Sequence, residues 1–168
     1  MEPWHDKQRL KLENVWKKDI SEIRTQVLEI WRNNAGPIGE RANERLSELV
    51  FVVSTTSGEV VGISTAFKAY VKRLRNHFYA LRLLLLPQYR IPGLTSKLLT
   101  ETCVFLESVH GQGEEEETIG VITLVENERL KQKRNEAVWP ASKMVYIGNS
   151  HDGHHLRVYY FAGARIKP

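Results

Sequence analysis

The feature that most constrains the fold is a change of periodicity between residues 76 and 110. Residues 78–86 form a nearly continuous apolar run of strand length, which predicts a strand buried on both faces of a sheet. Pro87 ends this run, and from Leu94 onward apolar residues recur every three to four positions, as in an amphipathic helix. The predicted stripe comprises Leu94, Leu98, Leu99, Thr102, Val104, Phe105, Leu106 and Val109.

A short loop, residues 88–95, joins the predicted strand to the predicted helix. The first amide hydrogens of a helix have no partners inside the helix, and the positive end of its dipole lies behind them, so this position is a candidate anion site. Arg90 would add a positive charge, and Gly93 would let a phosphate approach the backbone. The competing interpretation is an ordinary turn with a solvated Arg90.

The strand, the P-x-Y-R-x-x-G-x-T loop and the helix together resemble the acetyl-CoA-binding core of the GNAT family of N-acetyltransferases. The family pattern is Q/R-x-x-G-x-G/A, and Arg90, Gly93 and Thr95 occupy its three defined positions. Two departures are Thr95 in place of a final small residue, and Pro92, which removes one backbone donor. The resemblance implies an α/β GNAT-like acyl-CoA N-acyltransferase fold: a mixed, mostly antiparallel sheet with one parallel strand pair, flanked by helices.

The remaining segments follow the order of elements that this family uses. The strand after the central helix predicts a right-handed crossover with parallel pairing. We therefore expect one GNAT-like domain over residues 1–168. The other predicted strands are residues 9–16, 50–54, 60–71, 119–125, 144–147 and 156–161, and the other predicted helices start at Asp19 or span residues 39–49 and 127–137.

The resemblance also implies where acetyl-CoA would bind as co-substrate. The pantetheine arm and the thioester carbonyl would meet backbone amides at the end of the central strand, and the phosphates would meet the loop and the helix start. The implied cofactor-binding residues are Leu84, Leu85, Leu86, Arg90, Ile91, Gly93, Leu94, Thr95 and Ser96.

The catalytic groups are harder to assign. Many family members carry a tyrosine general acid in a stretch resembling N-x-x-A-x-x-x-Y, which this chain lacks after Asn135. Tyr146 is the nearest tyrosine and becomes the candidate acid, although a packed strand tyrosine is an equal interpretation. Glu126 is the candidate base, with His77 and Tyr79 as alternatives, and each could instead be structural. For residues 151–155 (HDGHH) we expect a solvated loop rather than a metal site, since a glycine-containing loop rarely fixes several ligands.

The net charge and the distribution of apolar residues limit the classes of partner that the chain is expected to bind. The net charge of +4 suits an anionic cofactor and also permits nucleic acid. No apolar run reaches membrane-spanning length and the N-terminus has no apolar signal core, so we expect no membrane partner and a cytoplasmic location. The lone Cys103 cannot form an internal disulfide and is expected in the core. The basic residues behind a weaker nucleic-acid hypothesis are Lys68, Lys72, Arg73, Arg75, Arg129, Lys131, Lys133 and Arg134.

The leading functional hypothesis is transfer of acetyl from acetyl-CoA to a primary amine by direct attack. The alternative is a catalytically degenerate GNAT-like module that binds CoA or a protein partner. The sequence leaves the acceptor amine open, and it leaves open a homodimer paired through the final hairpin.

Overall fold

The computed structural model describes residues 9–34, 41–110, 112 and 117–168. The predicted order of elements is confirmed, whereas the segments predicted around residues 35–40 and 113–116 lie outside the described residues. The elements are β1 (Lys11–Asn14), α2 (Arg24–Asn34), α3 (Ala42–Arg45), η2 (Leu46–Glu48), β2 (Leu49–Ser54), β3 (Val60–Val71), β4 (Asn76–Leu85), η3 (Pro87–Tyr89), α4 (Leu94–His110), β5 (Thr118–Val125), α5 (Glu128–Lys133), β6 (Val145–Asn149) and β7 (His155–Tyr160).

The strands form one seven-stranded sheet in the order β1-β2-β3-β4-β5-β7-β6. β4 and β5 pair in parallel, from His77 opposite Thr118 to Leu81 opposite Thr123. β1 with β2, β2 with β3, β5 with β7 and β6 with β7 pair in antiparallel fashion. The mixed sheet with one parallel pair confirms the predicted fold class, and β4–α4–β5 is the predicted crossover.

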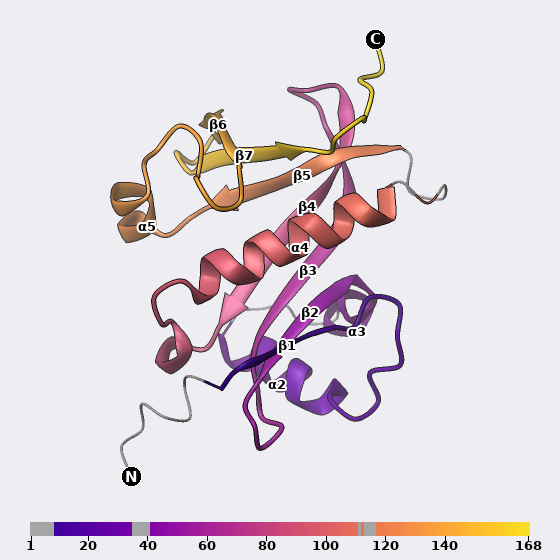
Figure 1. Cartoon of the computed structure of the whole chain (residues 1–168), viewed down its shortest axis with the longest axis vertical. Coiled ribbons are helices and arrows are strands. Elements are labelled where there is room, and N and C mark those ends of the chain that lie inside the picture. Colours follow the sequence, from indigo (N-terminus) through magenta and orange to yellow (C-terminus); the bar gives the residue numbers. More distant parts are fainter. Residues whose placement is uncertain (1–8, 35–40, 111, 113–116) are drawn as a thin grey trace. The chain divides into compact units, whose positions relative to one another are not determined.

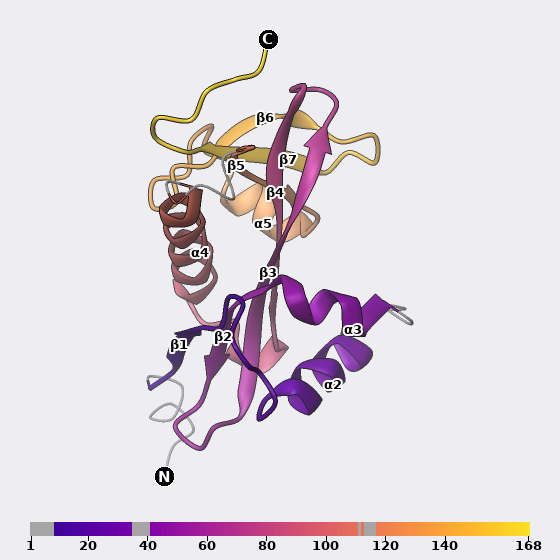
Figure 2. The ribbon, with the colours of Figure 1, turned by 90° about the vertical axis from the view of Figure 1, so that its right-hand side faces the viewer.

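The chain divides into two compact units, each made of separate segments. The first unit comprises residues 1–66 and 83–98, and the second comprises residues 67–82 and 99–168. In the first unit α2 and α3 lie together on one face of the strands (Figure 2). There Val27 and Trp31 of α2 pack against Val52 and Ile63.

The other face of the first unit is covered by the start of α4. Val53 and Val61 point to this face, because successive residues of a strand alternate between faces. They pack with Leu85 of β4 and with Leu94 and Leu98 of α4. The end of β4 therefore packs against side chains of β2 and β3 and against the start of α4.

In the second unit β5, β7 and β6 lie side by side (Figure 1), with a core of Phe78, Ile119, Ile122 and Val158. The C-terminal segment is fixed to α4 through one carboxylate. The Tyr159 hydroxyl donates to both Glu107 carboxylate oxygens at 3.0 and 3.1 Å, and the Ala162 amide donates to the same group at 2.7 Å.

Several local expectations were wrong. Val104 is 56% exposed, so it lies outside the apolar stripe of α4. The predicted burial of residues 78–86 on both faces holds only in part: Phe78, Tyr79, Leu81 and Leu85 are buried, but Arg82 is exposed and Leu84 is half-buried. The first long helix begins at Arg24 rather than at Asp19, whose carboxylate instead accepts the Ser21 amide in a preceding turn.

The helix after β5 is also shorter than predicted, although its cap is confirmed. The Asn127 side chain accepts the Leu130 amide at 3.0 Å, as expected for an N-cap. α5 nevertheless ends at Lys133 rather than at residue 137. The reason is competition for the next carbonyl: the Arg134 oxygen accepts the Trp139 indole N–H at 2.8 Å and an Arg157 N–H at 3.2 Å.

Among the described residues no helix is both long enough and apolar enough to span a membrane. Cys103 is buried in α4, as predicted, with 1% of its surface exposed.

Candidate functional site

The loop before α4 has the geometry of an anion site. Gly93 immediately precedes the helix with φ of +83°, a left-handed conformation that glycine adopts without steric cost. A Cβ at Gly93 would meet no atom within 4 Å, so the backbone angle rather than crowding calls for glycine there. The Tyr89 amide donates to Leu86 O at 2.9 Å and the Ile91 amide to Tyr89 O at 2.8 Å, which fixes the turn ahead of it.

The first turn of α4 keeps two amide donors available. The Leu94 amide donates to Ile91 O at 3.3 Å and the Lys97 amide to Gly93 O at 2.9 Å. For the amides between them, those of Thr95 and Ser96, the described residues supply no acceptor. These donors lie at the positive end of a 17-residue helix. Pro92 lies before Gly93, so the backbone N–H that proline lacks is not one of the donors in the first turn of α4.

Arg90 is positioned beside the same turn by the strand that precedes it. Its side chain is exposed, and its Nε donates to the Leu85 carbonyl at 3.1 Å. This tether leaves the two terminal nitrogens of the guanidinium for an anion, in the geometry that suits phosphate oxygens. The Leu85 carbonyl therefore points away from β3, toward the loop.

The register of β4 separates the three leucines that the resemblance implied. The Leu86 amide donates to Val61 O of β3 at 2.9 Å, and by alternation the Leu84 amide faces β3 as well. The Leu85 amide faces the opposite edge. On that edge the ladder ends at Leu81, whose carbonyl accepts the Thr123 hydroxyl at 3.2 Å. Leu85 is thus the leucine of the three whose amide faces an unpaired edge.

Gly62 of β3 allows this end of β4 to sit closely. A Cβ at Gly62 would lie 2.3 Å from Leu85 Cδ2 and 3.3 Å from the Leu84 carbonyl oxygen. The first unit therefore brings together the end of β4, Arg90, Gly93 and the start of α4, which are the predicted cofactor residues.

The second unit carries the predicted acid and base. Glu126 directly follows β5 and is exposed. Tyr146 lies in β6 with 40% of its surface exposed, and its hydroxyl donates to Asn149 Oδ1 at 2.8 Å. The alternatives are less open: Tyr79 is 1% exposed, and His77 is half-buried in edge contact with Tyr70.

Two residues lie beside Tyr146: His155, which the sequence analysis assigned to a solvated loop, and Arg157, which it did not single out. The His155 ring stands edge-on to the Tyr146 ring with centroids 5.2 Å apart. Arg157, two residues further along β7, is 1% exposed, and its guanidinium lies 4.2 Å from the Trp139 ring centroid. A period-two pattern of polar residues at 155, 157 and 159 was the available signal, because such residues share one face of a strand.

Arg157 organises the segment between α5 and β6. Its terminal nitrogens donate to the carbonyls of Arg134, Ala137 and Met144 at 3.2 to 3.5 Å. Burial lowers the pKa of Arg157 from its usual value, and electrostatic interaction with Glu136 and with Tyr146 opposes this shift. The guanidinium is therefore a buried cation held by carbonyl oxygens and an aromatic face.

The histidines at 151–155 are only partly the solvated loop that we expected. His151 is exposed, but His154 and His155 are half-buried, and Nδ1 of each is buried with no hydrogen-bond partner among the described residues. No group of three or more potential metal ligands occurs in the described chain.

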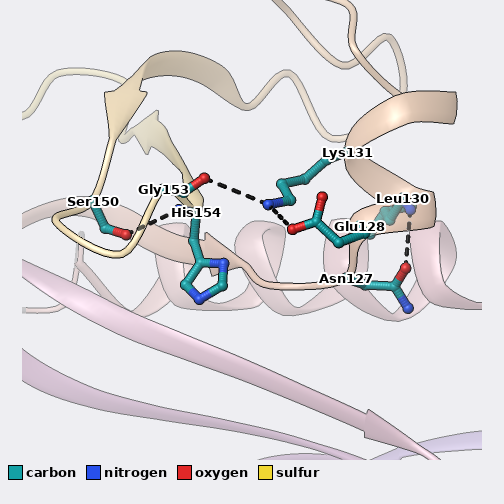
Figure 3. Close-up of polar contacts among 7 residues, drawn as sticks. All are labelled: Asn127, Glu128, Leu130, Lys131, Ser150, Gly153 and His154. Carbon is teal, nitrogen blue, oxygen red and sulfur yellow. Dashed lines mark hydrogen bonds and ion pairs between the residues drawn. The ribbon is translucent and has the colours of Figure 1, made fainter.

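The β6–β7 hairpin is braced against α5 (Figure 3). Lys131 forms an ion pair with Glu128 and also donates to the Gly153 carbonyl at 3.4 Å, while the His154 amide donates to the Ser150 hydroxyl at 3.1 Å. The imidazole of His154 takes part in none of the contacts drawn.

Arg73, like Lys131, is a basic residue of the nucleic-acid hypothesis that has a structural role. Arg73 donates to the carbonyls of Ile147 and Asn149 at 3.3 and 3.1 Å, next to Gly148 at φ of +115°. Its charge is used to hold β6, which leaves fewer free cations on this surface.

Comparison with known proteins identifies the fold. The sequence matches no protein-family model, and no curated protein matches it. Solved structures do match: ribosomal-protein-S5-alanine acetyltransferase from Vibrio fischeri at 9% identity with a TM-score of 0.61, covering 94% of this chain and 96% of that one. The GNAT N-acetyltransferase YhbS from Escherichia coli, in complex with CoA, matches at 15% identity and a TM-score of 0.60, covering 92% and 82%.

A GNAT-family acetyltransferase from Streptococcus pneumoniae is similar as well, at 13% identity with a TM-score of 0.57, covering 92% of this chain and all of that one. The chain therefore has the fold of the GNAT acetyltransferases over nearly its whole length.

Proposed function

We propose that this protein is an N-acetyltransferase that moves the acetyl group of acetyl-CoA to a primary amine by direct attack. The observation that carries the proposal is the loop at Gly93, where a left-handed glycine, two unpartnered amides and the tethered Arg90 meet at the start of α4. A pyrophosphate supplies the acceptor oxygens and the negative charge that these donors need.

The residues present fit the rest of the cofactor too. The Leu85 amide faces an unpaired edge of β4, as a group that binds the pantetheine arm or polarises the thioester carbonyl must. The similar YhbS structure contains CoA, which supports an acyl-CoA ligand for this fold. Acetyl-CoA supplies the thioester. The chain supplies the donors that hold it and the groups that move protons.

Calorimetric titration with acetyl-CoA, and in parallel with CoA, tests the cofactor site. Both should bind, and Arg90→Glu should weaken binding by about 100-fold, because it removes charge-assisted bonds and adds repulsion. Arg32→Glu is the matched control, since Arg32 is an exposed arginine of α2 in the same unit. Equal affinity in Arg90→Glu and Arg32→Glu would refute the phosphate role of Arg90.

A second candidate is a GNAT-like module that binds CoA without turnover. It is favoured by the segment after α5, which leaves the helical conformation at Arg134 and contains no tyrosine before β6. Release of free thiol from acetyl-CoA in the presence of any tested amine would exclude it. Suitable probe amines are spermidine, polylysine and a peptide with an N-terminal alanine.

A further inference from the structure

The turn between β3 and β4 and the C-terminal segment form one surface of the second unit. Asn76, which is 4% exposed, joins them: its Nδ2 donates to the Leu74 carbonyl at 3.0 Å, and its Oδ1 accepts the Lys167 amide at 2.9 Å. Ala164 of the C-terminal segment packs against the same apolar core as Val71 and Leu74. All of these residues belong to the second unit, so the surface is complete within it.

This surface is basic. No Asp or Glu occurs from residue 60 to residue 100, a stretch that contains the whole of β3 and β4. Among the described residues, the carboxylate that pairs with the surface is that of Glu117, whose Oε1 lies 3.8 Å from the Lys167 amine. The exposed cations are Lys68, Lys72, Arg75 and Arg165. Positive charge concentrated in this way attracts polyanions.

One face of the β3–β4 hairpin also carries an exposed aromatic ring between its cations. Lys68 and Tyr70 share a face of β3 because strand side chains alternate, at a spacing of about 7 Å, and Lys72 follows directly after the strand. Tyr70 is 55% exposed, and His77 of β4 stands edge-on to it with ring centroids 5.2 Å apart. Proteins that bind single-stranded nucleic acid combine such groups, because the rings stack on bases and the cations contact phosphates.

We propose that this surface binds single-stranded nucleic acid, with Tyr70 stacking on a base and with Lys72 and Arg75 contacting the phosphates on either side. The inference does not rest on the proposed acetyl transfer, because the surface lies in the second unit and the Gly93 loop lies in the first. Either proposal can therefore fail without the other.

An anionic lipid surface is the competing partner for a basic patch of this kind. Lipid headgroups would satisfy the cations equally well. The exposed ring of Tyr70, supported by a second ring at its edge, favours a ligand with flat bases instead. Vesicles therefore form one arm of the test.

Fluorescence anisotropy with labelled oligonucleotides tests the proposal. The probes are a mixed-sequence RNA of about 16 nucleotides, the upper site size of single-strand-binding folds, the matching DNA strand and the duplex. The wild-type protein should bind the single strands more tightly than the duplex, because only unpaired bases offer their faces to a ring. Affinity should fall with salt, with a slope of about 0.7 for each phosphate contact.

Three tyrosine variants separate stacking from charge. Tyr70→Ala should weaken RNA binding by about tenfold or more, and Tyr70→Phe should stay within about twofold of wild type because it keeps the ring. Tyr160→Ala is the matched control. Tyr160 is 48% exposed and lies edge-on to Phe78 with centroids 5.7 Å apart, on the other face of the sheet because residues 77 and 78 alternate.

Arg75 gives a test in which binding and stability change in opposite directions. Its φ is +51°, a left-handed conformation that glycine adopts at lower cost. Arg75→Gly should therefore raise the free energy of unfolding and weaken RNA binding by about fivefold at about 0.1 M salt, the effect of one lost phosphate contact. Lys143→Gly is the control: Lys143 is an exposed cation of the same unit with φ of +62°, so this variant should gain stability and keep full affinity.

Three results would overturn the proposal. Neither strand might bind to the wild-type protein, or RNA affinity might be equal in Tyr70→Ala and Tyr160→Ala. Phosphatidylserine vesicles that bind as tightly as RNA, with no effect of Tyr70→Ala on either ligand, would identify a lipid-binding surface instead. Unfolding curves for each variant confirm that the chain is folded, and acetyl-CoA binding is measured separately.

Discussion

The two compact units hold their polar groups by different means. In the first unit the donors are backbone amides, set out by one glycine angle and the start of one helix, with a single exposed arginine beside them. In the second unit they are side chains of β6 and β7, partly buried and aligned by the register of two strands. A backbone site depends on local dihedral angles, whereas a side-chain site depends on which residues end up opposite one another.

The largest stability effect should come from removing the cation that orders the second unit. Arg157→Ala should lower the free energy of unfolding by about 3 kcal/mol, because three carbonyls lose a charged donor and Trp139 loses the guanidinium on its face. Denaturant unfolding measures the change. Arg165→Ala is the control, because Arg165 is an exposed arginine of the same unit.

If the comparison between the units is right, folded Arg157→Ala protein should still bind acetyl-CoA within about threefold of wild type, because Arg157 and the Gly93 loop belong to different units. Stability equal to that of Arg165→Ala would mean that the segment between α5 and β6 is held by other contacts.

An effect of intermediate size should distinguish the backbone conformation of Gly93 from its role in ligand binding in the first unit. Gly93 and Gly58 have φ of +83° and +87°, and a Cβ at either would meet no atom within 4 Å. Gly93→Ala and Gly58→Ala should therefore each cost about 1 kcal/mol of stability, the penalty for an L-residue in that conformation.

Only Gly93→Ala should also weaken acetyl-CoA binding, by about tenfold, since Gly58 is in the β2–β3 hairpin and Gly93 precedes α4. Calorimetry on both variants decides this. Equal losses of affinity, or none in either, would contradict the assignment of the loop as the phosphate site.

This difference between the units explains what the sequence could predict. The glycine, the arginine and the change of periodicity around residues 86–94 are local, so the loop, the strand and the helix were all confirmed. The exposure of Val104 was missed because the buried stripe covers only part of the surface of α4, and this apolar residue lies outside it. The contact of Tyr146 with His155 was missed because it depends on pairing across a bulged register between Tyr146 and Gly148, which no local pattern encodes.

The length of α5 was missed for a related reason. Asn127 marks a helix start in the sequence, and its cap was confirmed. The helix end depends on Trp139 and Arg157. Their side-chain N–H groups donate to the Arg134 carbonyl, which would otherwise accept the amide of a later helical residue. A tertiary contact of this kind overrides helix propensity.

The smallest effect should come from the single thiol. Burial raises the pKa of Cys103 to about 12, with a smaller contribution from repulsion by Glu107, so the thiol is protonated near neutral pH and is a poor nucleophile. Cys103→Ala should change kcat by less than about twofold if the amine attacks the thioester directly. Mass spectrometry of the wild-type protein with acetyl-CoA should find no acetylated Cys103, and a transient acetyl-cysteine would replace direct attack by a two-step transfer.

The same shift predicts a pH effect whose sign follows from linkage. The Cys103 thiol has an ordinary pKa of 9.0 when unfolded and about 12 when folded, so between these values the unfolded chain releases a proton that the folded chain keeps. Stability is therefore full below pH 9 and falls as the pH rises toward 12. Cys103→Ala should make this alkaline decline shallower in unfolding experiments, and an unchanged slope would mean that the thiol ionises as easily in the fold as in the open chain.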